Sequence, residues 1–150
     1  MANDWAEMER DLYTQVRTGD GTITRGFFAG RQVLLLTTTG AKSGEPRTTP
    51  LVYSHEGDRV VIIASKGGSP THPAWYLNIL ANPIVTVEAA GETWQARATV
   101  VADEADRRRI YDQHADLHSS FSEYEAQAGD RVIPVILLER LPAPALAAAS

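Results

Sequence analysis

The chain has 150 residues, a formal net charge of −5, 43% hydrophobic and 22% charged residues, and no cysteine. A chain of this length forms about one domain and buries roughly 68–70% of the surface that it exposes when unfolded. The lack of cysteine excludes disulfides, thiolate metal sites and cysteine nucleophiles, and it fits a reducing compartment. The excess of acidic over basic residues argues against a nucleic-acid binder, because neutralising phosphates requires a basic face.

The sequence shows no export signal and no membrane-spanning segment. Residues 1–11 contain four acidic residues and one arginine, without the apolar stretch of a signal peptide. The longest apolar runs, 60–64 and 132–138, are far shorter than the ~20 residues of a membrane helix. We therefore expect a cytoplasmic protein whose membrane contact would be peripheral, at the inner face.

The first half of the chain is expected to form one helix followed by strands. Asp4 and Glu7 match a capping box, and apolar residues follow at helical spacing, which predicts an amphipathic helix over 4–17: Trp5, Met8, Leu12 and Val16. A glycine-rich loop, 18–30, leads into strands at 33–37, 48–54 and 59–65. We expect these three consecutive strands to form a meander.

The second half mixes helices and strands without a βαβ pattern. Pro73 marks the first turn of a helix that runs through 75–81, and strands at 84–89 and 92–101 form a hairpin. Asp103 is expected to cap a helix over 104–115, and a short helix follows at 121–128. The last strand, 132–138, contains Pro134, which implies an edge strand or a bulge.

This order of elements favours an α+β fold, a barrel-like sheet of about six mostly antiparallel strands with flanking helices. We predict an N-terminal helix and loop over 1–30, a barrel domain over 31–141, and a disordered Ala/Pro-rich tail over 142–150.

Two glycine turns that carry basic residues are candidate anion sites. Lys42 lies in the turn 40–44, Arg47 follows it, and Lys66 lies in the turn 65–68. Residues 31–83 contain five basic and three acidic residues, whereas the rest of the chain contains nine and sixteen. Backbone N–H groups of such turns, with a forked arginine, can bind phosphate or carboxylate. The alternative is that these side chains are simply solvated.

Other motifs give little support to a site. The turn 40–43 lacks the glycines of a nucleotide P-loop, and no GxGxxG segment opens a helix. His114 and His118 have the spacing of metal ligands, but no third ligand is evident, so we interpret them as surface histidines near a helix end and predict no metal. Four aromatic residues are more typical of a core, although the Tyr124 hydroxyl can donate a proton if it lines a cleft: Trp75, Tyr76, Phe121 and Tyr124.

Several segments in fixed order resemble the deazaflavin-dependent nitroreductase family of actinobacteria. They are 37–47 (TTTGAKSGEPR), 64–68 (ASKGG), 72–78 (HPAWYLN), 82–83 (NP) and 131–135 (RVIPV). The resemblance extends from about Gly30 to Leu141, roughly three-quarters of the chain. It implies a split β-barrel, similar to FMN-binding barrels, and reduced coenzyme F-420 as hydride donor to a quinone or nitroaromatic acceptor.

The resemblance also implies roles for individual residues. That coenzyme carries a phosphodiester and an oligoglutamate tail, which Lys42, Ser43, Arg47 and Lys66 are expected to contact. The segment that borders the deazaflavin ring matches Ala64, Ser65, Gly67 and Gly68, and the helix beside the cofactor matches Trp75 and Asn78. Related quinone reductases have several tyrosines around the acceptor; this chain has Val52, His118, Phe121 and Tyr124 at those positions.

We therefore predict a reductase in which Ser65 and Tyr124 stabilise charge that develops on the acceptor, with solvent as the alternative proton source. Two other functions stay open. One is a binding module that carries a flavin or deazaflavin without turnover, and the other is an FMN-dependent enzyme of the pyridoxamine-oxidase type. The N-terminal helix is expected to pack on the barrel, to close over the acceptor pocket or to contact a membrane, and the protein to be a monomer or homodimer.

Overall fold

The computed structural model describes residues 2–26, 28–69, 71–118 and 120–142, excluding the side chains of residues 2–5. The Trp5 side chain and the predicted tail from residue 143 therefore lie outside the described part. The helices are α1 (Ala2–Thr18), the short 3-10 turn η1 (Lys66–Gly68), α2 (Ala74–Ala81), α3 (Glu104–Leu117) and α4 (Ser120–Gln127). The strands are β1 (Val33–Thr39), β2 (Pro46–Val52), β3 (Ser54–Glu56), β4 (Arg59–Ile63), β5 (Ile84–Ala89), β6 (Glu92–Val100) and β7 (Val135–Arg140).

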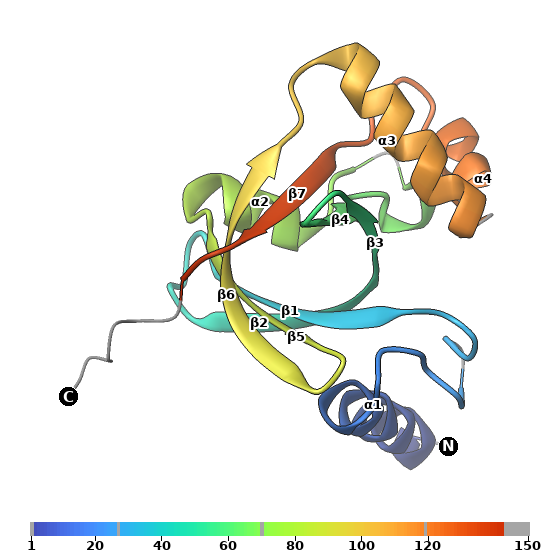
Figure 1. Ribbon diagram of the computed structural model, residues 1–150, viewed down its shortest axis with the longest axis vertical. Coiled ribbons are helices and arrows are strands. Elements are labelled where there is room, and N and C mark those ends of the chain that lie inside the picture. Colours follow the sequence, from blue (N-terminus) through green and yellow to red (C-terminus); the bar gives the residue numbers. More distant parts are fainter. Residues whose placement is uncertain (1, 27, 70, 119, 143–150) are drawn as a thin grey trace.

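The described strands form one antiparallel sheet in the order β2-β1-β5-β6-β7-β4-β3. Figure 1 shows this sheet curling into an open barrel, with α3 and α4 at one end and α1 beneath the other. The predicted α+β split barrel with flanking helices is confirmed.

The prediction of a single second strand over 48–54 is wrong, because the chain bends at Tyr53. Residues before the bend form β2, which pairs with β1, and residues after it form β3, which pairs with β4. Tyr53 is buried, and its N–H donates to the carbonyl of Gln32 at 3.3 Å. β2 and β3 thus lie at opposite edges of the sheet, and the bend that joins them brings these edges together. The three predicted strands therefore do not form one continuous meander: β1 pairs with β2, and β3 pairs with β4.

The last strand also differs from the sequence prediction. β7 begins at Val135, one residue after Pro134, and lies between β6 and β4 inside the sheet. Pro134 thus precedes the hydrogen-bonded strand, and it implies neither an edge strand nor a bulge. The Pro134 carbonyl still accepts the N–H of Ala64 at 3.0 Å, so the pairing of β7 with β4 continues one residue beyond both strands.

Both faces of β1 are buried, which explains its uninterrupted apolar sequence. Val33 and Leu35 belong to a cluster that includes residues of α1, α3 and α4, whereas Leu34 and Leu36 belong to a second cluster with Trp75 of α2. The sheet separates the two clusters, so α1, α3 and α4 pack on one face of its strands and α2 packs on the other.

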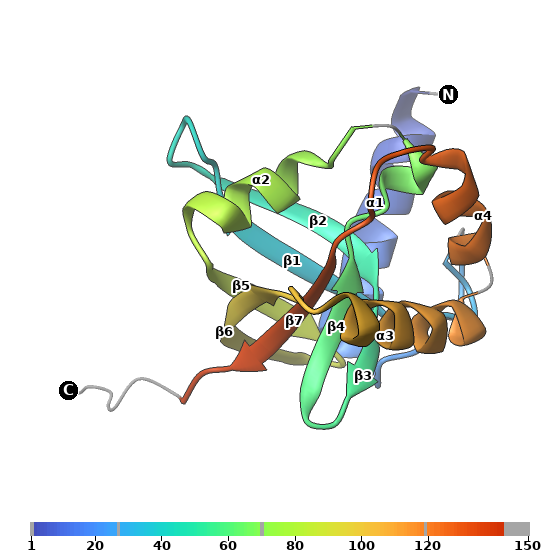
Figure 2. The ribbon, with the colours of Figure 1, turned by 90° about the horizontal axis from the view of Figure 1, so that it is seen from above.

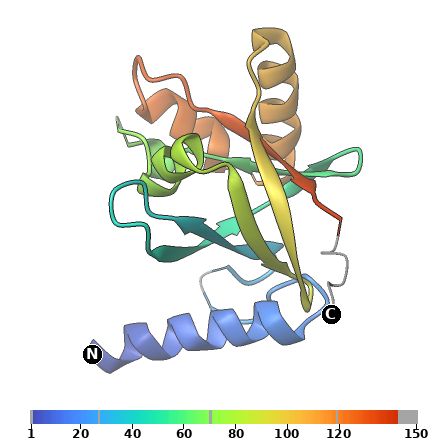
Figure 3. The same ribbon diagram turned by 90° about the vertical axis from the view of Figure 1, so that its left-hand side faces the viewer.

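The N-terminal helix packs against the barrel through its C-terminal part. Val16 is fully buried, its carbonyl accepts the N–H of Gly91 at 3.0 Å, and Arg17 pairs with Glu88 at 2.8 Å. Figure 3 shows α1 crossing beneath the barrel, away from α3. The helix already includes Ala2, so the predicted capping box at Asp4 is wrong. Among the described residues, no helix has the length and apolarity needed to cross a membrane.

Candidate functional site

A groove of about 500 Å³ lies between the turn that joins β1 to β2 and the first turns of α2. It contains five of the residues that sequence analysis assigned to the cofactor: Lys42, Ser43, Arg47, Trp75 and Asn78. The two elements are far apart in the sequence but adjacent in space (Figure 2). The groove therefore brings the first basic turn and the predicted cofactor helix into one site.

The turn from Gly40 to Glu45 is closed by its own hydrogen bonds. The N–H of Gly40 donates to the Glu45 carbonyl at 2.8 Å, and the N–H of Glu45 donates to Ser43 Oγ at 3.1 Å. A Cβ on Gly40 would come within 2.5 Å of Ser43 Oγ, and Gly44 has a φ of +74°. Glycine at these two positions thus allows a compact turn that presents Lys42 to the groove.

Asn78 connects this turn to α2. Its Oδ1 accepts the N–H of Ala41 at 2.9 Å, and its Nδ2 donates to Thr38 Oγ1 at 3.0 Å. Both Asn78 and Thr38 are buried. The amide side chain is therefore engaged by the protein itself, and it positions the turn relative to the helix.

The groove is locally cationic in an acidic protein. Lys42 and Arg47 line it, and the carboxylate near Arg47 is that of Glu45, at 3.9 Å with both side chains more than half exposed. Such an exposed pair is weak, so it leaves Arg47 free to bind an anion. Electrostatic attraction of an acidic ligand is the chemistry that this arrangement favours.

The second basic turn lies at a different place, against α4. Ala64 and Ser65 are buried at the end of β4, and Lys66 is exposed on η1 with a φ of +49°. Gly68 has a φ of +83°, and a Cβ there would come within 2.9 Å of the Tyr124 carbonyl. Figure 2 shows η1 beside α4, with α2 farther from α4. The structure thus separates Lys66 from the groove that holds Lys42 and Arg47.

Arg131 is the residue that the site analysis of the sequence missed. Its guanidinium donates to the carbonyls of Ser69 (2.9 Å), Ala64 (3.0 Å) and Ser65 (2.6 Å), and it contacts His72 Nδ1 at 3.0 Å. Its place in the 131–135 motif was the only signal in the sequence, because its partners are some 60 positions away.

The residues predicted around the acceptor are mostly core residues. Val52, His118 and Phe121 are buried, and His118 Nε2 donates to the Tyr53 carbonyl at 3.1 Å. Tyr124 is half-buried, and its ring packs edge-on against Phe121 with centroids 5.1 Å apart. Of these four, Tyr124 is the side chain that retains exposure.

The interpretation of His114 and His118 as surface histidines is wrong. His114 is completely buried, its Nδ1 is hydrogen-bonded to Ser54 Oγ at 2.7 Å, and the two imidazoles are 4.8 Å apart. Burial, with a smaller effect of His118, lowers the pKa of His114 to about 3. Burial likewise lowers the pKa of His118, against the opposing effect of the Tyr53 carbonyl. Among the described residues, no group of three potential ligands could hold a metal ion.

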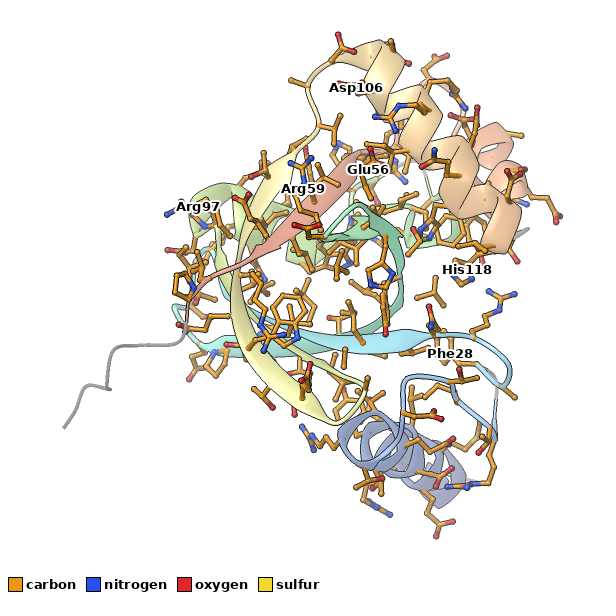
Figure 4. All side chains as sticks on the ribbon, in the orientation of Figure 1. Phe28, Glu56, Arg59, Arg97, Asp106 and His118 are labelled. Carbon is orange, nitrogen blue, oxygen red and sulfur yellow. The ribbon has the colours of Figure 1, made fainter. Side chains whose placement is uncertain are left out.

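A second groove, of about 410 Å³, lies between α1 and the neighbouring loop. Met8, Leu12, Phe28 and Pro50 give it an apolar lining, and Asp11 pairs with Arg25 in its wall at 2.6 Å. Figure 4 shows Phe28 above α1. Pro50 follows Thr48 and Thr49 of the cationic groove along β2, so the same strand borders both grooves.

Residues 8–140 match the family model described as F420H(2)-dependent quinone reductase. An F420H(2)-dependent quinone reductase of Mycobacterium tuberculosis is 38% identical over 109 residues, which cover 71% of this chain and 72% of the relative. Among solved structures, an F420-H2 dependent reductase (FDR-A) has a TM-score of 0.64 and 37% identity, covering 71% of this chain and 93% of its own. A structure described as a domain-swapped dimer has a TM-score of 0.66 and 32% identity, covering 93% of this chain and 100% of its own.

Proposed function

The chain belongs to the F420H(2)-dependent quinone reductase family, and from this premise we propose that it transfers hydride from reduced coenzyme F-420 to an apolar acceptor such as a quinone or a nitroaromatic. The family confirms the resemblance noted in the motifs. The observation that carries the proposal is the cationic groove between the β1–β2 turn and α2, in a protein whose net charge is −5.

The residues of this groove fit the acidic part of the cofactor. A phosphodiester and an oligoglutamate tail need cationic side chains and N–H donors, which Lys42, Arg47 and the turn around Ser43 supply. Among the described residues, the carboxylate that Arg47 contacts is that of Glu45, at 3.9 Å, so binding an anion would not break a strong ion pair. Lys66, on the separate turn η1, would contact a part of the cofactor outside this groove.

The protein's task in this reaction is to position and shield the cofactor, which supplies the hydride. Trp75 is buried and lines the groove, so it offers a rigid apolar wall, while Asn78 fixes the turn that carries Lys42. We assign the backbone of Ala64–Gly68 to the border of the deazaflavin ring. Its conformation is fixed by contact with α4 and by Arg131.

The acceptor is proposed to bind near Tyr124, with Ser65 as a second polar group. Val52, His118 and Phe121 are buried, so they would support the wall of this pocket from behind. The apolar groove beside α1 is the place that we propose for the apolar part of the acceptor. Met8, which is 47% exposed, supports a peripheral contact of α1 with the inner face of a membrane. The chain is proposed to be cytoplasmic and monomeric or homodimeric.

Cofactor titration of the purified protein tests the proposal. We expect binding of F-420 in preference to FMN, because only the former carries an oligoglutamate tail for the cationic groove. Arg47→Ala should lower the affinity for F-420, whereas Arg59→Ala, a change of an exposed arginine outside the groove, should leave it unchanged. Preference for FMN would support the pyridoxamine-oxidase type instead. Tight F-420 binding without turnover would support the non-catalytic module.

A further inference from the structure

The Arg131 side chain contacts four residues between Ala64 and His72. Its Nη1 and Nη2 donate to the carbonyls of Ala64 and Ser65 at the end of β4, and its Nε donates to the carbonyl of Ser69 after η1. Its contact with His72 Nδ1 at 3.0 Å adds the residue that precedes α2 by two positions. One guanidinium therefore connects the exit of β4, the turn η1 and the approach to α2.

The charge of Arg131 is not compensated in the usual way. Several arginines of the protein pair with carboxylates, as Arg107 does with Glu104 and Arg108 with Glu125. Within the described part of the chain, Arg131 has no carboxylate within ion-pairing distance, and its contacts are carbonyl oxygens and an imidazole. Burial lowers its pKa. This arginine therefore serves the geometry of the backbone around it, for which its planar fork of donors is suited.

The segment that Arg131 holds contains an unfavourable backbone conformation. Lys66 has a φ of +49°, in a region that side chains other than glycine, asparagine and aspartate rarely adopt. Such a conformation persists only where the surroundings fix it. On one side Gly68 packs against the Tyr124 carbonyl, and on the other Arg131 binds the carbonyl of Ser65, the residue directly before Lys66.

We infer that Arg131 is a positioning residue for cofactor binding, which acts by fixing Lys66 in its left-handed conformation. His72 Nδ1 must accept from the guanidinium, because a guanidinium has donors only. Lys66 Nζ donates to Thr71 Oγ1 at 3.2 Å, so the ammonium group is also directed by the segment that Arg131 organises. This inference rests on the proposed function, because it assigns Lys66 to binding of F-420.

The test is a double-mutant cycle read by titration of F-420 at low salt. Arg131→Lys keeps a positive charge but cannot span three carbonyls, and Lys66→Ala removes the proposed contact. We expect each change to lower the affinity about tenfold, and the double variant to bind no more than a few-fold more weakly than either single variant, because both changes remove the same interaction. The affinity of the wild type should fall as salt rises, in part because of Lys66. This part of the salt dependence should be lost in Arg131→Lys as it is in Lys66→Ala.

The controls separate this role from a purely structural one. Arg107→Lys changes another arginine that donates to a carbonyl, that of Ile133 at 3.2 Å, and should leave F-420 affinity unchanged. If Arg131→Lys does not fold, Arg131→Gln replaces it in the cycle, since its amide keeps two donors. Effects that multiply to about a hundredfold, or an unchanged affinity in Arg131→Lys, would overturn the inference. A wild-type protein that binds no F-420 would instead overturn the proposed function, and the inference with it.

Discussion

Acidification should destabilise the fold through the buried imidazoles of His114 and His118. His114 Nε2 and His118 Nδ1 are buried without a hydrogen-bond partner among the described residues. Protonation would place a charge next to a second imidazole in the apolar cluster around Phe121. The folded protein therefore keeps His114 neutral, with a pKa of about 3.

The size of this effect follows from proton linkage. An unfolded histidine has a pKa of about 6.5, so between this value and about 3 the unfolded state binds a proton that the folded state does not bind at His114. The free energy of unfolding is thus fully maintained above about pH 6.5 and falls by about 1.4 kcal/mol for each pH unit below it. From pH 7.5 to 5.0, His114 alone lowers it by about 2 kcal/mol, and His118 acts in the same direction.

Urea unfolding at pH 7.5 and 5.0 measures the loss. His114→Leu should lose about 2 kcal/mol less than the wild type over this range, because one of the two buried imidazoles is gone. His55→Gln removes an exposed imidazole from β3 and serves as the matched control for the loss of a histidine. Equal losses in wild type, His114→Leu and His55→Gln would refute the argument from the buried pair.

Asn78→Ala should lower the free energy of unfolding by about 1–3 kcal/mol, since it leaves the buried Thr38 hydroxyl without its hydrogen bond and frees the N–H of the exposed Ala41; an unchanged urea midpoint would contradict that role. Arg47→Ala and Lys66→Ala should each weaken F-420 binding about tenfold at low salt, or roughly 1.5 kcal/mol, and by less at high salt. Unchanged titrations for both would remove these cations from the cofactor site. Tyr124→Phe should lower kcat less than tenfold if the ring only packs, as its contact with Phe121 favours, whereas a fall of about 10²–10⁴ would make its hydroxyl a proton donor. Leu12→Ser should raise the KM for apolar acceptors and leave F-420 affinity intact; a parallel loss of cofactor affinity would contradict the role proposed for the groove beside α1.

Local features of the sequence predicted most of the elements. Asp103 accepts the N–H of Asp106 at 2.9 Å at the start of α3, as its capping position indicated. The hairpin of β5 and β6 pairs around Ala90 and Gly91, both of which have positive φ. These features depend on a few neighbouring residues, so short-range patterns are enough to identify them.

Features that depend on distant contacts were not accessible in this way. The bend at Tyr53 is held by Gln32, and the burial of His114 depends on Ser54, which is 60 positions away. Spacing alone gave two histidines on one helix face, but it could not show that β3 covers that face. Likewise, the basic turns at Lys42 and Lys66 have similar sequences, and only the fold shows that α2 borders one and α4 the other.

Deletion of residues 1–17 would not test the acceptor pocket alone, because α1 also packs on the barrel. The structure places Val16 in the core and pairs Arg17 with Glu88. Truncation is therefore expected to lower stability, and point changes such as Leu12→Ser separate the groove from the packing of α1.

Single-turnover oxidation of the cofactor tests the central claim most directly. The protein is loaded with reduced F-420, mixed with a soluble quinone in the absence of oxygen, and followed by the absorbance of the oxidised deazaflavin. We predict oxidation that depends on quinone concentration and is much faster than that of free reduced F-420. Equal rates with and without the protein, although F-420 is bound, would contradict the assignment as a reductase.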